Sequence, residues 1–219
     1  MNHAEPYLPA LRFHWLTPFY DVAVRLTTRE TTFKRRLLEQ ADLQSGQNVL
    51  DVGCGTGTLA LRAGRLEPNI RVTGLDADAR ILALARHKAR DVGPTVEFTQ
   101  GWADRLPFAD GSFDRALSSL FFHHLLPAQK VAALSEIFRV LRPGGEVHIA
   151  DWGRATSPLA RRLFFYVQVF DGFPTTRDHV AGRFPQSLAD TGFCDVQVRD
   201  NLLTMFGTLS LFSGCKPTA

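Results

Sequence analysis

Three glycines at alternate positions, Gly53, Gly55 and Gly57, follow a short apolar run that contains one acid, Asp51. Glycine lets a backbone turn sharply and come within contact distance of a ligand. The apolar run, residues 49–52, predicts a buried strand, and a helical pattern begins directly after the third glycine. A glycine turn between a strand and a helix predicts a nucleotide-sized crevice at the carboxyl edge of a sheet.

A second acid, Asp76, closes the next apolar run, about 20 residues beyond the glycines, where a carboxylate can accept from ribose hydroxyls. The glycine spacing is G-x-G-x-G, with Thr58 where the dinucleotide fingerprint has its third glycine. Asp51, just before the turn, would repel a diphosphate. This combination favours a ligand with a cationic amino group and no phosphate over a nicotinamide dinucleotide.

Residues 51–57 read D-V-G-C-G-T-G and, with Asp76, resemble the class I S-adenosylmethionine (SAM) methyltransferases. The stretches 106–114, 118–125 and 136–145 are similar to the subgroup that includes the ubiquinone/menaquinone-biosynthesis C-methyltransferases. The resemblance implies a Rossmann-like, doubly wound α/β fold: a seven-stranded sheet with an antiparallel last strand and helices on both faces. It also implies SAM as the cofactor and S-adenosylhomocysteine as its product.

The resemblance carries a set of cofactor contacts onto this chain, but one position departs from the family's pattern. The residue after Gly101 is usually acidic or an amide and accepts from the adenine amino group; here it is Trp102. Asp104 would then substitute for it, while Trp102 either stacks on the adenine or turns into the core. The residues expected to contact SAM are Tyr20, Asp51, Gly53, Cys54, Gly55, Gly57, Asp76, Ala77, Trp102, Ala103, Asp104 and Ser118.

The elements expected from hydrophobic periodicity and from turn residues form one domain of 219 residues. A proline-glycine turn is expected at residues 142–145, a break at 171–174, and a tight antiparallel hairpin at the end of the chain. We expect helices over residues 58–66, 79–90, 127–141, 158–170 and 183–192, and strands over 49–52, 70–75, 96–99, 113–119, 146–150, 194–203 and 207–215.

This domain is expected to have four parts. Residues 1–44 form an N-terminal helical lid, 45–152 the SAM-binding core, 153–182 a helical insertion on the substrate side, and 183–219 the last helix and hairpin. In related families a Tyr-Asp pair such as Tyr20-Asp21 lies near the methionine end of the cofactor. The alternative is that the N-terminal helix only packs on the sheet edge.

Composition narrows the partners. Hydrophobic residues make up 45%, charged residues 21%, and the net charge of +3 is not gathered into a basic stripe, so a nucleic-acid partner is not expected. Three cysteines without C-x-x-C spacing favour a reducing cytoplasm. No signal peptide and no apolar run of about 20 residues is found, so no transmembrane segment is expected. The sequence leaves open whether the protein forms a homodimer.

Methyl transfer from a sulfonium needs alignment and, for a phenol, hydroxyl or enolic carbon, a general base. The candidates at the ends of the fourth and fifth strands are His123, His124 and Asp151, with His14 from the lid. Adjacent residues are not expected to face the same way, and we favour His124. Alternatively, the histidine pair is structural, and Asp151 either orients a histidine, binds a substrate hydroxyl or caps a helix. No metal site is expected, because the two histidines lack ligand spacing and supporting carboxylates.

The acceptor is expected to be a small, apolar molecule such as a quinone, a phenol or a lipid. Phenylalanines in residues 163–173, with Phe121 and Phe122, either line its pocket or belong to the core of a helix. The competing function is a SAM-binding protein without transferase activity, such as a sensor or a partner subunit.

Overall fold

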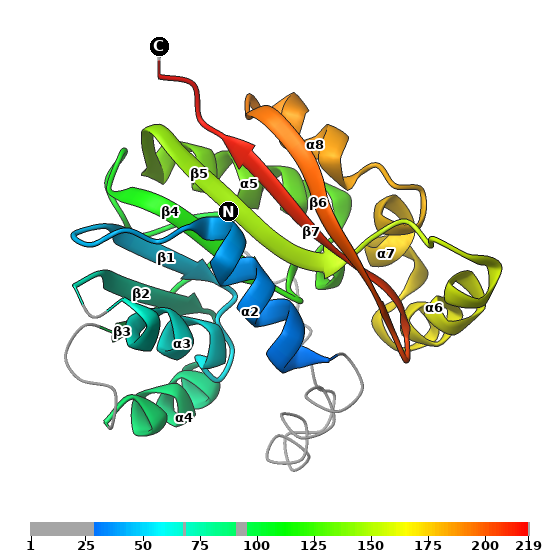
Figure 1. Cartoon of the computed structure of the whole chain (residues 1–219), viewed down its shortest axis with the longest axis horizontal. Coiled ribbons are helices and arrows are strands. Elements are labelled where there is room, and N and C mark those ends of the chain that lie inside the picture. The colour runs from blue at the N-terminus through cyan, green and yellow to red at the C-terminus, as the bar shows by residue number, and fades with distance from the viewer. Residues whose placement is uncertain (1–28, 68, 91–95, 219) are drawn as a thin grey trace, which may run out of the picture.

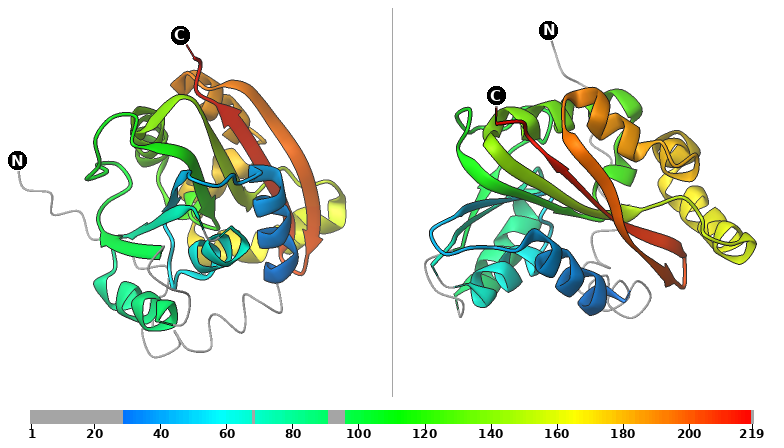
Figure 2. Two further views of the ribbon diagram at one scale, coloured as in Figure 1. Left: turned by 60° about the vertical axis from the view of Figure 1, so that its left-hand side comes forward. Right: turned by 45° about the horizontal axis from the view of Figure 1, so that its top comes forward.

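The computed structural model describes residues 29–67, 69–90 and 96–218, which form one seven-stranded sheet with helices on both faces (Figures 1 and 2). The strands are β1 (Asn48–Val52), β2 (Arg71–Asp76), β3 (Val96–Gln100), β4 (Phe113–Ser119), β5 (Leu141–Trp152), β6 (Cys194–Thr204) and β7 (Gly207–Cys215). The helices are α2 (Glu30–Ala41), α3 (Thr58–Leu66), α4 (Ala79–Ala89), the 3-10 turn η2 (Phe122–His124), α5 (Pro127–Val140), α6 (Pro158–Asp171), α7 (Phe173–Val180) and α8 (Phe184–Thr191).

The strand order is β3-β2-β1-β4-β5-β7-β6, and β1 to β5 run parallel. β7 lies antiparallel between β5 and β6, which confirms the predicted antiparallel end of the sheet. From β1 the chain builds the sheet first outward through β2 and β3, and then on the other side through β4 and β5. The carboxyl ends of β1 and β4 therefore meet at a switch point, where α/β sheets commonly bind ligands. The doubly wound class is confirmed.

Two apolar clusters cover the two faces of the sheet, because neighbouring side chains of a strand point to opposite sides. Val49 belongs to the cluster that contains side chains of α2, α3, α4 and α6. Leu50 belongs to the cluster that contains side chains of α5 and α8. The central strands are buried on both sides and hold their carboxyl-end residues rigidly.

The structure differs from the expected elements in two places. The proline-glycine stretch 142–145 is not a separate turn: α5 ends at Val140 and β5 starts at once, with Gly144 at φ +75° inside the extended segment. Residues 171–174 end α6 but do not end the helical region. A second helix, α7, begins at once, with Pro174 in its first turn. The sequence pattern did not predict α7.

The final hairpin also brings two cysteines together. Cys194 and Cys215 are register partners of β6 and β7, and the Cys194 thiol donates to the carbonyl of Cys215. The fold thus makes these two cysteines neighbours although they are distant in the sequence, and both thiols are free.

The described part of the predicted lid is α2, which packs on the sheet. Phe33 and Leu37 are fully buried in the first cluster, and Gln40 donates to the carbonyl of Phe212 in β7. Lys34 contacts both Glu30 and Thr58, so α2 is tied to the start of α3. Among the described residues, no helix combines the length and the apolar character needed to cross a membrane. The division of the domain into four parts stays a prediction.

Candidate functional site

The glycine loop, residues 53–57, connects β1 to α3 at the switch point. All three alternate glycines have left-handed backbones, at φ +68° for Gly53, +53° for Gly55 and +77° for Gly57. A Cβ added to Gly53 would overlap the ring of Phe121, and one added to Gly57 would lie 2.6 Å from the ring of Phe98. Glycine is required here both by backbone conformation and by packing.

Asp76 ends β2 and faces this loop. Its Oδ2 accepts from the amide of Gly55 at 3.0 Å, and its Oδ1 accepts from the amide of Asp78 at 3.0 Å. Burial raises the pKa of the Asp76 carboxyl, although the backbone donors lower it in part. Ala77 follows directly and accepts from the side chain of Gln100. The carboxylate therefore lies at the carboxyl end of β2, beside the glycine loop, and its contact with a ribose stays a prediction.

Asp51 lies fully buried under the loop. Its Oδ2 accepts from the amide of Ala60 at 3.1 Å, while its Oδ1 is buried without a hydrogen-bond partner among the described residues. Burial raises the pKa of this carboxyl to about 7, although the nearby Lys34 ammonium lowers it. An unsatisfied buried carboxylate oxygen is costly, and a cationic donor would relieve that cost.

At the neighbouring strand ends, Asp151 holds His123. Nδ1 of His123 lies 2.7 Å from Oδ1 of Asp151, and since a carboxylate only accepts, the ring proton is on Nδ1. The carboxylate also accepts from the amides of Phe121, His123 and Trp152. Burial opposes both charges, but the pairing outweighs it, so the pKa of Asp151 is lowered and that of His123 is raised.

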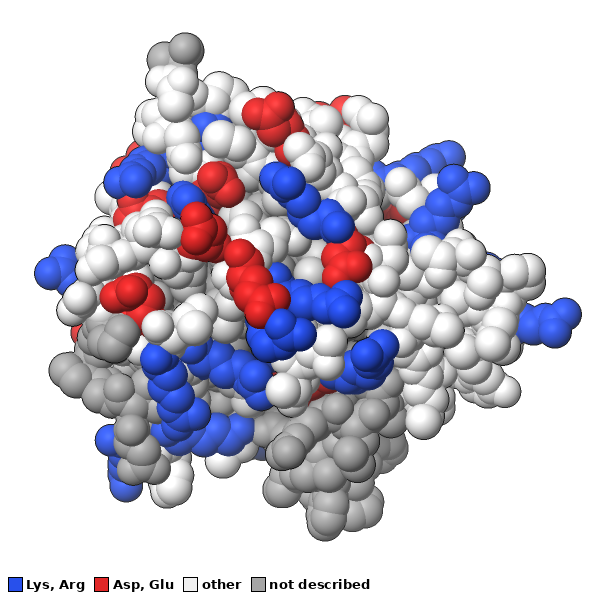
Figure 3. Space-filling model, in the orientation of Figure 1, with Lys and Arg blue, Asp and Glu red and all other residues white. Residues whose placement is uncertain are grey.

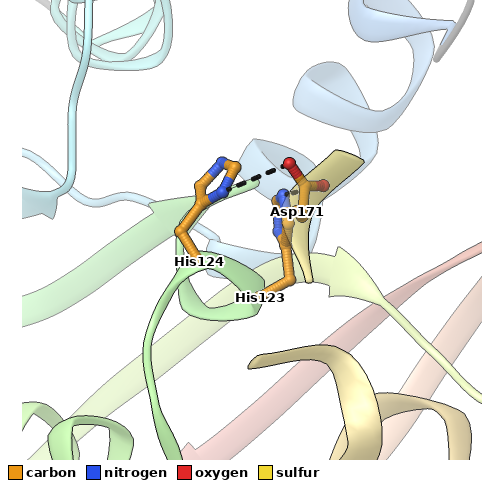
Figure 4. Close-up of side chains that lie close together, drawn as sticks. All are labelled: His123, His124 and Asp171. Carbon is orange, nitrogen blue, oxygen red and sulfur yellow. Dashed lines mark ion pairs between the residues drawn. The ribbon is translucent and has the colours of Figure 1, made fainter. Parts of the chain in front are cut away.

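Asp171, at the end of α6, completes what we call the histidine cluster: His123, His124 and Asp171 (Figure 4). Its carboxylate lies 3.7 Å from Nε2 of His123 and 3.7 Å from Nδ1 of His124. The two rings are 3.9 Å apart between centroids. Burial, together with the charge of His123, places the pKa of His124 well below its usual value.

This cluster corrects two expectations. The adjacent histidines do face the same carboxylate, because they lie in the 3-10 turn η2 and not in an alternating strand. Supporting carboxylates are also present, Asp151 and Asp171, so the reason given for expecting no metal site is wrong. Asp171 was interpreted only as part of a helix break. Its signal was the single acid of α6, placed at the last residue of that helix.

Comparison with known proteins decides the family. Residues 49–145 match the model of the methyltransferase domain. The demethylmenaquinone methyltransferase of Thermus thermophilus is 32% identical over 94% of this chain and 100% of its own length. The ubiquinone/menaquinone biosynthesis C-methyltransferase UbiE of Hahella chejuensis is 34% identical over 60% of this chain, and this chain covers 53% of it.

The chain belongs to the SAM-dependent methyltransferases. A SAM-dependent methyltransferase from Methanosarcina mazei has the same fold, with a TM-score of 0.65 at 24% identity over 81% of this chain and 95% of that one. Phosphoethanolamine N-methyltransferase 2 of Haemonchus contortus, solved with S-adenosylhomocysteine, gives a TM-score of 0.69 at 20% identity over 85% and 52%. The predicted family, fold and cofactor are confirmed, and the non-catalytic alternative is set aside.

The site of this methyltransferase fits SAM. The orphaned Oδ1 of Asp51 suits the methionine ammonium, and Asp76 suits the ribose. Cys54 and Ser118 are engaged within the protein: the thiol is buried with a raised pKa, and the Ser118 hydroxyl donates to the carbonyl of Val52 at 2.8 Å. Burial, then the neighbouring Asp51 charge, raises that thiol pKa, so Cys54 stays protonated. Contacts of these two residues with SAM stay predictions.

The predicted adenine side is the loop after β3. The amide of Gly101 donates to the carbonyl of Asp76 at 3.0 Å, so this loop adjoins the residue predicted to bind the ribose. Trp102 is 55% exposed, which excludes the alternative that it turns into the core. Ala103 is half-buried and Asp104 is exposed on the same loop. Adenine contacts by all three stay predictions.

The phenylalanine alternatives divide between core and surface in this methyltransferase. Phe122 is fully buried against Phe184, and Phe121 packs on the first glycine of the loop. Phe164 is buried against Trp152, whereas Phe170 is 85% exposed. Tyr20 and His14 lie outside the described residues.

Proposed function

We propose that this enzyme transfers the methyl group of SAM to an oxygen or carbon of a small, apolar acceptor, and that His123 takes the acceptor's proton. The observation that carries the proposal is the buried pair of His123 and Asp151 at the carboxyl ends of β4 and β5. The raised pKa of His123 means that its neutral form is reached at higher pH than for an ordinary histidine. In that form Asp151 holds the proton on Nδ1, and the Nε2 lone pair is left as an acceptor. This is the arrangement by which an aspartate orients a catalytic histidine.

The position of the pair supports the chemistry. The residue that starts the 3-10 turn, Phe121, packs against Gly53, so the base adjoins the loop proposed to hold the methionine end of SAM. In-line transfer from a sulfonium depends on alignment, which is worth about 7–11 kcal/mol in well-oriented reactions. A positioned base adds about 10²–10⁴-fold. Sequence alone favoured His124; the hydrogen bond to Asp151 favours His123, with His124 beside it.

An apolar acceptor is supported by the surface of the helical insertion. Large apolar side chains of α6 and α7 are exposed, and this part of the molecule is mostly white in Figure 3, with Lys or Arg side chains at its margin. The Thermus thermophilus relative is named as a methyltransferase of demethylmenaquinone, which is a quinone. On the remainder of that face Asp and Glu lie among the Lys and Arg of the upper half, whereas the lower half shows mainly Lys and Arg. The exposed apolar residues of these helices are Leu159, Phe165, Tyr166, Val169, Phe170 and Phe173.

The test is a panel of acceptors with purified enzyme and SAM, with S-adenosylhomocysteine as the readout. Quinols with short and long tails, catechols and other phenols should be methylated, and polar amines such as phosphoethanolamine should not. Turnover of the amines alone would overturn the proposal. We also propose a cytoplasmic location, supported by the three free thiols.

A further inference from the structure

We infer that the histidine cluster, His123, His124 and Asp171, binds one divalent transition-metal ion of the zinc type. The ligand atoms of these residues all lie within 4.8 Å of one another. They come from two elements 47 residues apart, since His124 is in η2 and Asp171 ends α6. Figure 4 shows both rings turned toward the same carboxylate.

The distances suit a shared ion. The two oxygens of Asp171 each lie 3.7 Å from a ring nitrogen, one from His123 and one from His124. Zinc bonds of about 2.0–2.1 Å place neighbouring tetrahedral ligands about 3.3 Å apart. A shared ion requires these ligand atoms, now up to 4.8 Å apart, to approach one another by as much as about 1.5 Å. At 3.7 Å the present contacts are too long for hydrogen bonds, so the cluster is not already satisfied by its own members.

A second, independent feature is the carboxylate behind His123. A metal-binding histidine usually donates its other ring nitrogen to a carboxylate, which sets the tautomer and the ring orientation. Asp151 does this at 2.7 Å and is itself fixed by three backbone amides. The Nε2 lone pair of His123 is thereby directed at Asp171. A chance contact between His123 and Asp171 would not require a second carboxylate that fixes the His123 ring.

The donor set selects the class of ion. Two imidazoles and one carboxylate favour Zn²⁺, Co²⁺ or Fe²⁺ over Mg²⁺ and Ca²⁺, which prefer oxygen ligands. Three protein ligands leave a coordination position for water or for a small molecule. The Lys130 ammonium, whose charge acts on both histidines, is itself engaged, because it donates to Asp178 and to the carbonyl of Thr175.

The consequence for turnover rests on the proposed function. An ion bound to Nε2 of His123 takes the lone pair that would accept the acceptor's proton. Metal and general base therefore compete for one atom. Micromolar Zn²⁺ should inhibit methyl transfer, and a chelator should restore it.

Binding is tested first, without any acceptor. The untagged chain is titrated with Co²⁺, whose visible absorption reports tetrahedral nitrogen and oxygen ligands. We expect one Co²⁺ per chain, displaced by one Zn²⁺. Asp171→Asn and His124→Gln should weaken binding by more than about 100-fold, and Asp151→Asn by about 10–100-fold as an outer-shell change. Matched controls are the exposed residues Asp190→Asn and His87→Gln, which should bind as wild type.

Retained SAM affinity shows that each variant is folded. Absence of the Co²⁺ bands in the wild type, or equal binding by the cluster variants and the controls, would overturn the metal site. Co²⁺ binding without inhibition of any methyl transfer would leave the metal site standing and overturn the assignment of His123 as the base. The two proposals can thus fail separately.

Discussion

The glycine loop and the histidine cluster adjoin each other through Phe121, yet they are built in opposite ways. The loop is a continuous run of five residues between one strand and one helix, and its three glycines have left-handed backbones. The cluster uses side chains from η2 and α6, and its support, Asp151, comes from β5. One region is local in the chain and the other is assembled by folding.

This difference has a functional meaning. A cofactor shared by a whole family is bound by a backbone shape that many side chains can surround. The acceptor differs between enzymes, so its site is expected to depend on side chains carried by a variable insertion. Here α6 and α7 supply Asp171 and the exposed apolar surface. The predictions below separate the two regions, from the largest effect to the smallest.

Replacing His123 with Gln should lower turnover by about 10²–10⁴-fold, because the proton acceptor is lost. The dissociation constant of SAM, measured by calorimetry, should change less than twofold, since the glycine loop is untouched. His124→Ala should lower turnover less, also at unchanged SAM affinity. Full activity of His123→Gln would move this residue to a structural role.

Gly53→Ala should damage the cofactor region through packing. The left-handed backbone costs an alanine about 1–2 kcal/mol, and overlap with Phe121 adds about 1–3 kcal/mol. Gly46→Ala is the matched control, because Gly46 has φ +85° but no atom within 4 Å of an added Cβ. Denaturant unfolding of both variants measures the difference, and Phe121→Ala in the Gly53→Ala background should recover part of it. Equal losses would show that strain alone explains glycine here.

Asp76→Ala should weaken SAM binding by well over tenfold, since both the proposed ribose acceptor and the partner of the Gly55 amide are removed. Asp78→Ala is the control: Asp78 caps α4 by accepting from the amides of Arg80 and Ile81. Its loss should cost about 1 kcal/mol of stability without a comparable change in SAM affinity. Unchanged affinity in Asp76→Ala would refute the ribose assignment.

The smallest effect concerns pH. Asp51 has a pKa of about 7 in the folded protein against 3.8 for a free carboxyl, so the folded state holds its proton more tightly. The stability of the ligand-free protein should therefore fall as pH rises from about 4 to about 7. The SAM ammonium favours the ionised carboxylate, so affinity should rise with pH up to about 7, by at most about tenfold per unit. Calorimetry across this window measures it.

Asp51→Asn is the control for that profile. The variant cannot ionise at this position, so its SAM affinity should be lower at pH 8 and nearly flat below 7. An equally steep profile in the variant would assign the titration to another group.

The sequence by itself determined the cofactor region. Asp51, three glycines and Asp76 are close in the chain, and strand, turn and helix follow from local periodicity and from glycine's conformational freedom. The antiparallel end of the sheet was also predictable, because two strands joined by a tight turn must run antiparallel. The wrong predictions fall where proline and glycine can stand in more than one kind of element. The stretch 142–145 was expected to be a turn and belongs to β5, and the expected break at 171–174 contains the start of α7.

Only the tertiary structure decided the histidine cluster and the exposed apolar surface. Nothing in the spacing of His123, Asp151 and Asp171 shows that the three meet, because their distances depend on how β4, β5 and α6 pack. The sequence also does not distinguish Phe122 from Phe170, although the fold buries Phe122 and exposes Phe170. Local rules specify a backbone turn, whereas a side-chain cluster is specified by contacts between segments that the chain itself separates.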